Sequence, residues 1–106
     1  MAKHIPLEKT ITNNILKYLN GLPHCRARKI PGGAYGGGWP DIIAVKGGSA
    51  IFIEVKRPKT GKLTELQIRE LMSWSSVGAF CFIARSVQDV EDYLFKDGPD
   101  VTSIFQ

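Results

Sequence analysis

Three charged residues stand in a segment whose other residues are typical of two apolar β-strands, GGWPDIIAVKGGSAIFIEVKRPKTG, residues 37–61. Asp41 opens the first apolar run, and Glu54 and Lys56 interrupt the second. The chain has 106 residues, enough for one domain, 1–106, and for no second core. A domain of this size is only marginally stable, so charges directed toward its interior need a reason.

The types of these residues suggest a chemistry. Carboxylates gathered at one point repel each other and therefore need a cation, and ligation by oxygen atoms alone favours Mg²⁺ or Mn²⁺ over zinc. A lysine beside such a site can orient a water molecule or stabilise the charge that develops on a phosphoryl group. Asp41, Glu54 and Lys56 together therefore indicate cleavage of a phosphodiester bond.

The segment that carries these charges is predicted to be a β-hairpin. Residues 41–46 and 49–57 are rich in β-branched side chains, and Gly47-Gly48 between them is typical of a two-residue turn. Side chains alternate along a strand, so Glu54 and Lys56 share one face. Asp41 and Glu54 are both far from the turn, and we expect them at the same open end of the hairpin.

A helix is predicted at about residues 5–20, with Pro6 at its first helical position. When residues are placed 100° apart, Glu8 falls between Ile15 and Leu19, in the middle of the apolar stripe. A lone glutamate near a helix start is usually explained by its favourable interaction with the helix dipole. That ordinary explanation stays open for Glu8.

A second helix is predicted at residues 63–76, where Gln67 falls between Trp74 and Leu71 on the apolar side. A lone glutamine often reaches water past its neighbours, and Glu54 beside Lys56 could be an ion pair on an exposed strand. Five polar groups on four elements would, however, need five separate explanations. Their convergence favours one shared site.

The remaining elements complete an α/β domain with the order α-β-β-β-α-β-α. Residues 24–30 alternate and predict a short strand with Arg26 and Arg28 on one face. The run AFCFIA, residues 79–84, is apolar on both faces, as expected of an interior strand. Ser86 is placed to cap a last helix at residues 87–95, and no structure is predicted for residues 98–106.

Composition narrows the class of protein. The formal net charge is +4 and the pI is near 9.2, an excess of positive charge that favours acidic partners such as nucleic acid. Cys25 and Cys81 lack any paired spacing, which predicts reduced thiols in a cytoplasmic protein. No apolar run is long enough for a membrane span, and the start of the chain has no signal-peptide core.

The motifs resemble a known group of nucleases. Pro40-Asp41 followed by Glu54-Val55-Lys56 resembles the PD-(D/E)xK superfamily. More narrowly, Glu8, GGWPD, IEVK, Gln67 and FIARSVQD in this order resemble the VRR-NUC family, the virus-type replication-repair nucleases, over about residues 5–95. This resemblance implies a restriction-endonuclease-like core with a mixed central sheet flanked by helices. It also implies a divalent-metal-dependent DNA endonuclease of a bacterial or phage-infected cell.

The resemblance also implies a role for each motif residue. Asp41 and Glu54 would bind Mg²⁺ or Mn²⁺ together with the backbone carbonyl of Val55, and Lys56 would be the catalytic lysine. Glu8 would support the metal or its waters, and Gln67 would orient the site. Members that stand alone resemble Holliday-junction resolvases, which predicts branched DNA as substrate and a homodimer that cuts two strands symmetrically. Apolar residues near the C-terminus could form the dimer contact or close the core of the monomer: Tyr93, Leu94, Ile104 and Phe105.

The main alternative is a DNA-binding module without catalysis. Six basic residues would suffice for it, although each alone is more often a solvated surface charge: Arg26, Arg28, Lys46, Arg57, Lys59 and Lys62. A pure DNA binder gains nothing from Asp41 and Glu54 close to a phosphate, and this disfavours the alternative. The glycine-rich loop, residues 32–38, lacks the ending of a phosphate-binding loop. Tyr35 within this loop and Trp39 directly after it could stack on bases or pack on the core, and packing is favoured for Trp39.

Overall fold

The computed structural model describes residues 5–31 and 37–96. Their strands form one mixed sheet in the order β1-β2-β3-β4, in which β3 and β4 are parallel and the other pairs are antiparallel. The predicted order of elements is confirmed. The bounds are α1 (Glu8–Asn20), β1 (Cys25–Lys29), β2 (Ile42–Lys46), β3 (Ser49–Val55), α2 (Glu65–Ser76), β4 (Phe80–Ala84) and α3 (Val87–Phe95).

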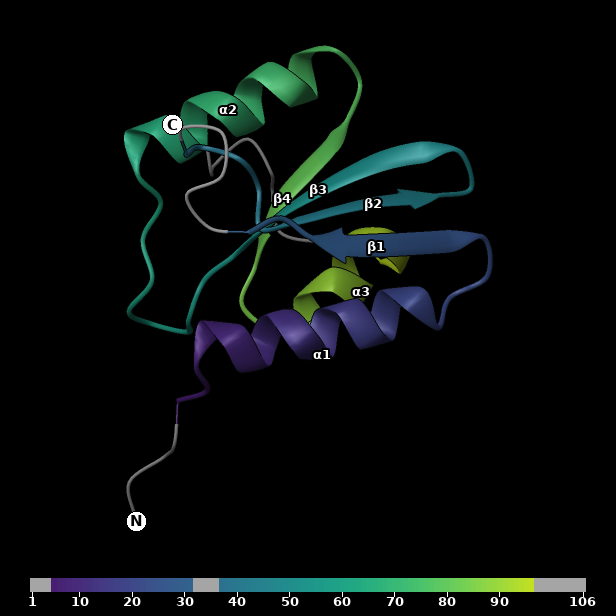
Figure 1. The fold of residues 1–106 in the computed structure, drawn as a ribbon, viewed down its shortest axis with the longest axis horizontal. Helices are drawn as coiled ribbons and strands as arrows, with labels where there is room; N and C mark the ends of the chain where they lie inside the picture. The colour runs from purple at the N-terminus through teal and green to yellow at the C-terminus, as the bar shows by residue number, and fades with distance from the viewer. Residues whose placement is uncertain (1–4, 32–36, 97–106) are drawn as a thin grey trace.

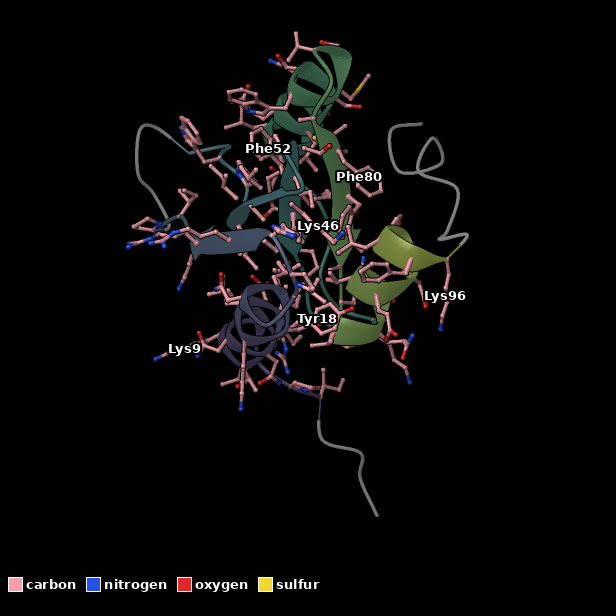
Figure 2. All side chains as sticks on the ribbon, turned by 90° about the vertical axis from the view of Figure 1, so that its right-hand side faces the viewer. Lys9, Tyr18, Lys46, Phe52, Phe80 and Lys96 are labelled. Atoms are coloured by element: carbon pink, nitrogen blue, oxygen red, sulfur yellow. The ribbon has the colours of Figure 1, made fainter. Side chains whose placement is uncertain are left out.

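Helices lie on both sides of the sheet, which makes three layers (Figure 1). Helices α1 and α3 lie on one face, where Ile15, Phe82 and Val90 are among the buried residues of the larger core. Helix α2 lies on the other face and buries Leu71 against Phe52 of β3 in a smaller core. Figure 2 shows Phe52 on the side of the sheet near α2. The alternation along β3 therefore directs Phe52, Glu54 and Lys56 toward the layer of α2.

The hairpin of β2 and β3 forms as the sequence predicts. Lys46 pairs with Ser49, which leaves Gly47 and Gly48 as the two turn residues. Their φ angles are 56° and 86°, in the left-handed region that a two-residue turn of this hand requires and glycine adopts at little cost. At the other end Ile42 pairs with Ile53, so Asp41 and Glu54 come next in the register.

The predicted start of the first helix is wrong. The helix begins at Glu8, and Pro6 lies before it because Leu7 has extended backbone angles and occupies the N-cap position. Leu7 is 58% exposed and Glu8 is exposed, so neither belongs to the apolar stripe that Ile11, Ile15 and Leu19 form. The periodicity that placed Glu8 among buried residues therefore fails in the first turn.

The position of β4 is also wrong in the prediction, because the described part of the sheet has β4 at its edge, paired only with β3. Its two faces are apolar for another reason. Cys81 packs in the core under α2, whereas Phe82 stacks on Tyr93 of α3 with ring centroids 4.3 Å apart. Helices on both faces thus give an edge strand the composition of an interior one.

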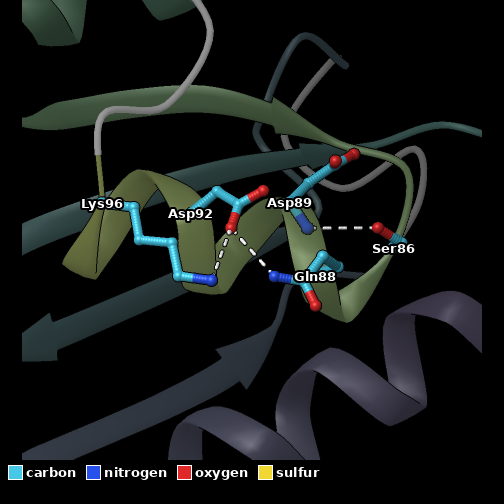
Figure 3. A network of polar contacts seen from close by, with 5 residues as sticks. All are labelled: Ser86, Gln88, Asp89, Asp92 and Lys96. Atoms are coloured by element: carbon cyan, nitrogen blue, oxygen red, sulfur yellow. Dashed lines mark hydrogen bonds and ion pairs between the residues drawn. The ribbon is translucent and has the colours of Figure 1, made fainter.

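Helix α3 begins as predicted at a cap made by Ser86, whose hydroxyl accepts a hydrogen bond from the Asp89 N–H at 3.1 Å (Figure 3). At the other end of the helix, Asp92 accepts from Gln88 at 2.9 Å and pairs with Lys96 at 3.6 Å. These contacts lie within residues 86–96 and stabilise the helix that covers β4. The predicted tail, residues 98–106, lies outside the described residues.

Both cysteines are free thiols, with Cys25 half-buried and Cys81 buried. Burial raises the pKa of Cys81 to about 11, so this thiol stays protonated and unreactive at neutral pH. Within the described residues, no helix is long and apolar enough to cross a membrane.

Candidate functional site

Asp41 and Glu54 come together at the open end of the hairpin. The Asp41 carboxylate accepts a hydrogen bond at 2.7 Å from the backbone N–H of Val55, the residue that follows Glu54. This bond fixes the Asp41 side chain against the last residue of β3. The two acids are close enough that Asp41 raises the pKa of Glu54.

Glu54 is a buried carboxyl, only 1% exposed. Burial, and next the Asp41 carboxyl, raise its pKa to about 9, while Lys56 acts in the opposite direction. Its Oε1 accepts a hydrogen bond from Gln67, but its Oε2 is buried and has no hydrogen-bond partner among the described residues. A buried oxygen of this kind is costly unless it holds a proton or faces a cation.

Both the oxygen and the nitrogen of the Gln67 side-chain amide make hydrogen bonds. Its backbone N–H donates to the Thr64 hydroxyl at 3.1 Å, and its Oε1 accepts from the Thr64 N–H at 2.9 Å, which together form a capping box at the start of α2. Because the amide oxygen is used in the cap, the amide nitrogen points the other way and donates to Glu54 at 2.9 Å. The predicted contact of Gln67 with the site is present.

Lys56 directly follows β3 and is 9% exposed. Its backbone N–H donates to the Ala84 carbonyl at 3.1 Å, which extends the parallel pairing by one residue beyond β3. The lysine is near enough to Glu54 to lower the pKa of that acid. The structure therefore brings Asp41, Glu54, Lys56 and Gln67 into one cluster.

Glu8 lies at the margin of this cluster. As the first residue of α1 it is exposed, yet its charge contributes to the raised pKa of Glu54. In the described parts of the chain, no three acidic, histidine or cysteine side chains lie close enough together to hold a metal ion. Glu8 is therefore near the two acids without joining them in a three-ligand group.

The basic residues fall into separate groups. Arg26 and Arg28 are exposed on one face of β1. Arg28 pairs with Ile43, and Ile43 pairs with Phe52, so this is the face of the sheet that also carries Glu54. A hollow of about 310 Å³ lies there, lined by both arginines, Ile43 and Val45, among others. Lys59 and Lys62 are exposed in the loop after β3. The Lys46 ammonium lies 5.0 Å from the ring of Phe95, a residue of α3 on the opposite face.

Arg57 has backbone partners that the sequence did not indicate. Its guanidinium donates to the carbonyls of Ile5 and Pro6, each at 3.1 Å, and so holds the segment that precedes α1. The segment leads directly to Glu8 at the start of the helix. The structure thus gives Arg57 a role in fixing the chain, and its prediction as a nucleic-acid contact stays untested.

The aromatic residue of the loop before Asp41 packs on α2, as predicted. Trp39 is half-buried, and its ring centroid lies 6.1 Å from that of Trp74. Gly38 has a φ of 79°, and a Cβ atom there would lie 3.0 Å from side-chain atoms of Leu66 and Glu70. Glycine adopts this φ at little cost, and a larger residue would also have to displace these side chains, so Gly38 lets the loop lie close to the helix. Tyr35 lies outside the described residues.

The donor set fits a divalent cation. The unpartnered Oε2 of Glu54 and the adjacent Asp41 carboxylate are hard oxygen ligands, which Mg²⁺ and Mn²⁺ prefer. A bound cation would also favour the ionised form of Glu54 and so oppose the burial and the effect of Asp41 that raise its pKa. The arrangement suits the chemistry that the sequence predicts.

Sequence reasoning missed two residues that shape the cluster. Thr64 could have been found, because Thr-x-x-Gln before an apolar run is a capping-box signature. Arg85 could not, since its donors go to backbone carbonyls of Arg57 and Gly61, more than twenty residues away in the chain. No local sequence pattern indicates a contact of that kind.

Comparisons with known proteins agree with this geometry. No curated protein matches the chain. A solved structure described as a VRR_NUC domain is similar with a TM-score of 0.61 and 23% identity, covering 82% of this chain and 89% of that one. This similarity confirms the predicted restriction-endonuclease-like fold and its likeness to VRR-NUC domains. The family model for the archaeal Holliday junction resolvase (hjc) matches residues 18–100. The chain therefore belongs to this resolvase family, which is a family of nucleases.

Proposed function

We propose that this protein is a divalent-metal-dependent DNA endonuclease that cleaves branched DNA, with four-way junctions as its best substrate. The observation that carries the proposal is the buried Glu54 carboxyl beside Asp41 and Lys56, whose Oε2 has no hydrogen-bond partner among the residues that the structure describes. A protein that only bound DNA would be destabilised by this arrangement without any gain. Membership in a resolvase family supports the choice of substrate.

In this proposal Asp41 and Glu54, with the backbone carbonyl of Val55, hold Mg²⁺ or Mn²⁺. The cation supplies charge stabilisation at the phosphate and makes a water molecule easier to deprotonate. The Asp41 carboxylate is held in place by the Val55 N–H, and Gln67 fixes the orientation of Glu54. Lys56 orients the attacking water or neutralises the charge that develops on the phosphoryl oxygens. Glu8 supports the waters around the cation from the start of α1.

The DNA would approach on the α2 side of the sheet. Arg26 and Arg28 are exposed on the same face as Glu54, and the exposed Lys59 and Lys62 follow the strand that carries Lys56. Positive charge in these places would bind phosphates on either side of the reacting one. We leave Arg57 out of this set, because its guanidinium donates to backbone carbonyls.

Symmetric cleavage of two strands requires two active sites, so we propose that the protein works as a two-fold homodimer. Of the residues predicted for the contact, Tyr93 and Leu94 pack against the core of the monomer. Ile104 and Phe105 lie outside the described residues. Light scattering across micromolar concentrations should give twice the chain mass, and a monomer mass throughout would contradict the dimer.

A cleavage assay on a panel of substrates tests the function. Purified protein is incubated with a four-way junction, a flap, a nicked duplex and a linear duplex in Mg²⁺, Mn²⁺ or EDTA. We expect cleavage only with metal and fastest on the junction, with Asp41→Ala and Glu54→Ala inactive but still able to bind DNA. Binding of DNA without cleavage of any substrate would favour the alternative, a non-catalytic DNA-binding module.

A further inference from the structure

The side chain of Lys56 is enclosed by the turn that follows it, residues 57–61. A Cβ atom added at Gly61 would lie 2.8 Å from the Cβ of Lys56 and 2.9 Å from the backbone nitrogen of Arg57. The backbone of Gly61 therefore lies directly against the stem of Lys56, at a distance that no larger residue allows. This contact helps to make Lys56 a buried lysine.

Arg85, which lies between β4 and α3, holds this turn in place. Its Nη1 donates to the carbonyl of Arg57 at 2.7 Å and to the carbonyl of Gly61 at 2.9 Å. The same Arg57 carbonyl accepts from the Gly61 N–H at 3.2 Å, which closes the turn. Hydrogen bonds from a charged donor are stronger than those between neutral groups, so Arg85 is a strong connection between the turn and the segment that joins β4 to α3.

The arginine itself is anchored. Its backbone N–H donates at 2.8 Å to Asp89, a residue in the first turn of α3. The adjacent Ala84 carbonyl accepts from the Lys56 N–H. Ala84 thus holds the backbone of Lys56, and Arg85, the next residue, holds the turn that covers its side chain.

We propose that Arg85 is a positioning residue for Lys56: by fixing the turn over the lysine stem it keeps the lysine side chain near Glu54 in the cluster. The inference rests on the proposed nuclease function. Without the two Arg85 hydrogen bonds the turn can lift from Lys56, and the lysine gains alternative rotamers. Its ammonium is then at the reacting phosphate for only part of the time. Neither the carboxylates nor the exposed basic residues change.

The kinetic test compares Arg85→Met, which keeps the stem and removes the donors, with Arg85→Lys, which restores a charged donor. We expect Arg85→Met to lower kcat by about 10-fold to 100-fold, with unchanged KM and unchanged Mn²⁺ affinity by calorimetry. Arg85→Lys should recover most of the rate. Lys17→Met, at an exposed residue near the far end of α1, is the control for loss of charge.

A double-mutant cycle separates positioning from a general structural role. Because Arg85 acts through Lys56, Arg85→Met should reduce the residual activity of Lys56→Ala no further. Equal reductions in both backgrounds, a changed KM, or full activity of Arg85→Met would overturn the proposal. Should Arg85→Met fail to fold, Arg85→Gln, a shorter neutral donor, replaces it in the same cycle and should likewise reduce the residual activity of Lys56→Ala no further.

A second readout does not depend on cleavage. Lys56 should react slowly with an amine-acylating reagent in the wild-type protein and several times faster in Arg85→Met, as measured by mass spectrometry of the modified peptides. Lys17 should react equally in both proteins. An unchanged rate at Lys56 would overturn the proposal. If the wild-type protein cleaves no DNA while the labelling changes as expected, the proposed function fails and the positional part of this inference stands.

Discussion

Replacing Glu54 by glutamine should stabilise the metal-free protein, although it removes a residue of the proposed site. Glu54→Gln keeps the shape of the side chain and the oxygen that accepts from Gln67, but it cannot ionise. In the wild-type protein the folded-state pKa of Glu54 is about 9, against an ordinary value of 4.5, because the carboxyl is buried and faces Asp41. The wild-type protein must therefore hold a proton there or bury a charge.

The direction of the pH effect follows from these values. Between pH 4.5 and about 9 the folded state binds a proton that the unfolded state releases. The contribution of Glu54 to the free energy of unfolding is favourable at low pH. It is lost as the pH rises, by about 1.4 kcal/mol for each pH unit inside this window. From pH 5 to pH 7 the free energy of unfolding of Glu54→Gln, relative to wild type, should rise by about 3 kcal/mol.

Urea unfolding in EDTA at pH 5, 6, 7 and 8 measures this difference. Glu65→Gln, at an exposed acid in the first turn of α2, is the control and should show a difference that does not grow with pH. Adding Mg²⁺ at pH 7 should stabilise the wild-type protein and not Glu54→Gln, because a ligand stabilises only the state that binds it. A pH-independent difference between Glu54→Gln and wild type would show that Glu54 does not take up a proton on folding.

Three other changes test the parts around the carboxylates. Thr64→Val should lower the free energy of unfolding by about 1 kcal/mol in urea titration and also slow cleavage, because it removes the cap that orients Gln67; an unchanged cleavage rate would contradict the orienting role. Gly61→Ala should reduce kcat but not DNA affinity, since its Cβ would lie 2.8 Å from that of Lys56, and equal kcat values would show that the turn adapts. Arg57→Ala should leave the salt dependence of DNA binding unchanged, whereas a slope smaller by about one would identify a phosphate contact.

The sequence was most informative where one local signal decides the structure. Gly47-Gly48 predicted the hairpin turn, and the turn set the register that brings Asp41 and Glu54 together. Alternation along the strand then placed Glu54 and Lys56 on one face, which the structure shows to be the side of α2. These inferences need only neighbouring residues, which is why they could be made from sequence.

Features that depend on distant partners could not be predicted. The first helix begins at Glu8 and not at Pro6, and the guanidinium of Arg57 holds the preceding carbonyls from 51 and 52 residues away. Among the described strands β4 lies at the edge of the sheet. Helices cover both of its faces, and apolar composition indicates this burial without indicating the order of the strands. The enclosure of Lys56 by Arg85 likewise has no sequence signature.

Asp41 and Glu54 are proposed to hold the catalytic cation. Anomalous scattering from a crystal grown or soaked in Mn²⁺ tests this most directly, because it locates the ion without reference to activity. We expect an anomalous peak bound by both carboxylates and by the carbonyl of Val55, and no peak there in Asp41→Ala. A protein that cleaves DNA in Mn²⁺ with its anomalous peak elsewhere, or with none at this position at saturating Mn²⁺, would contradict it.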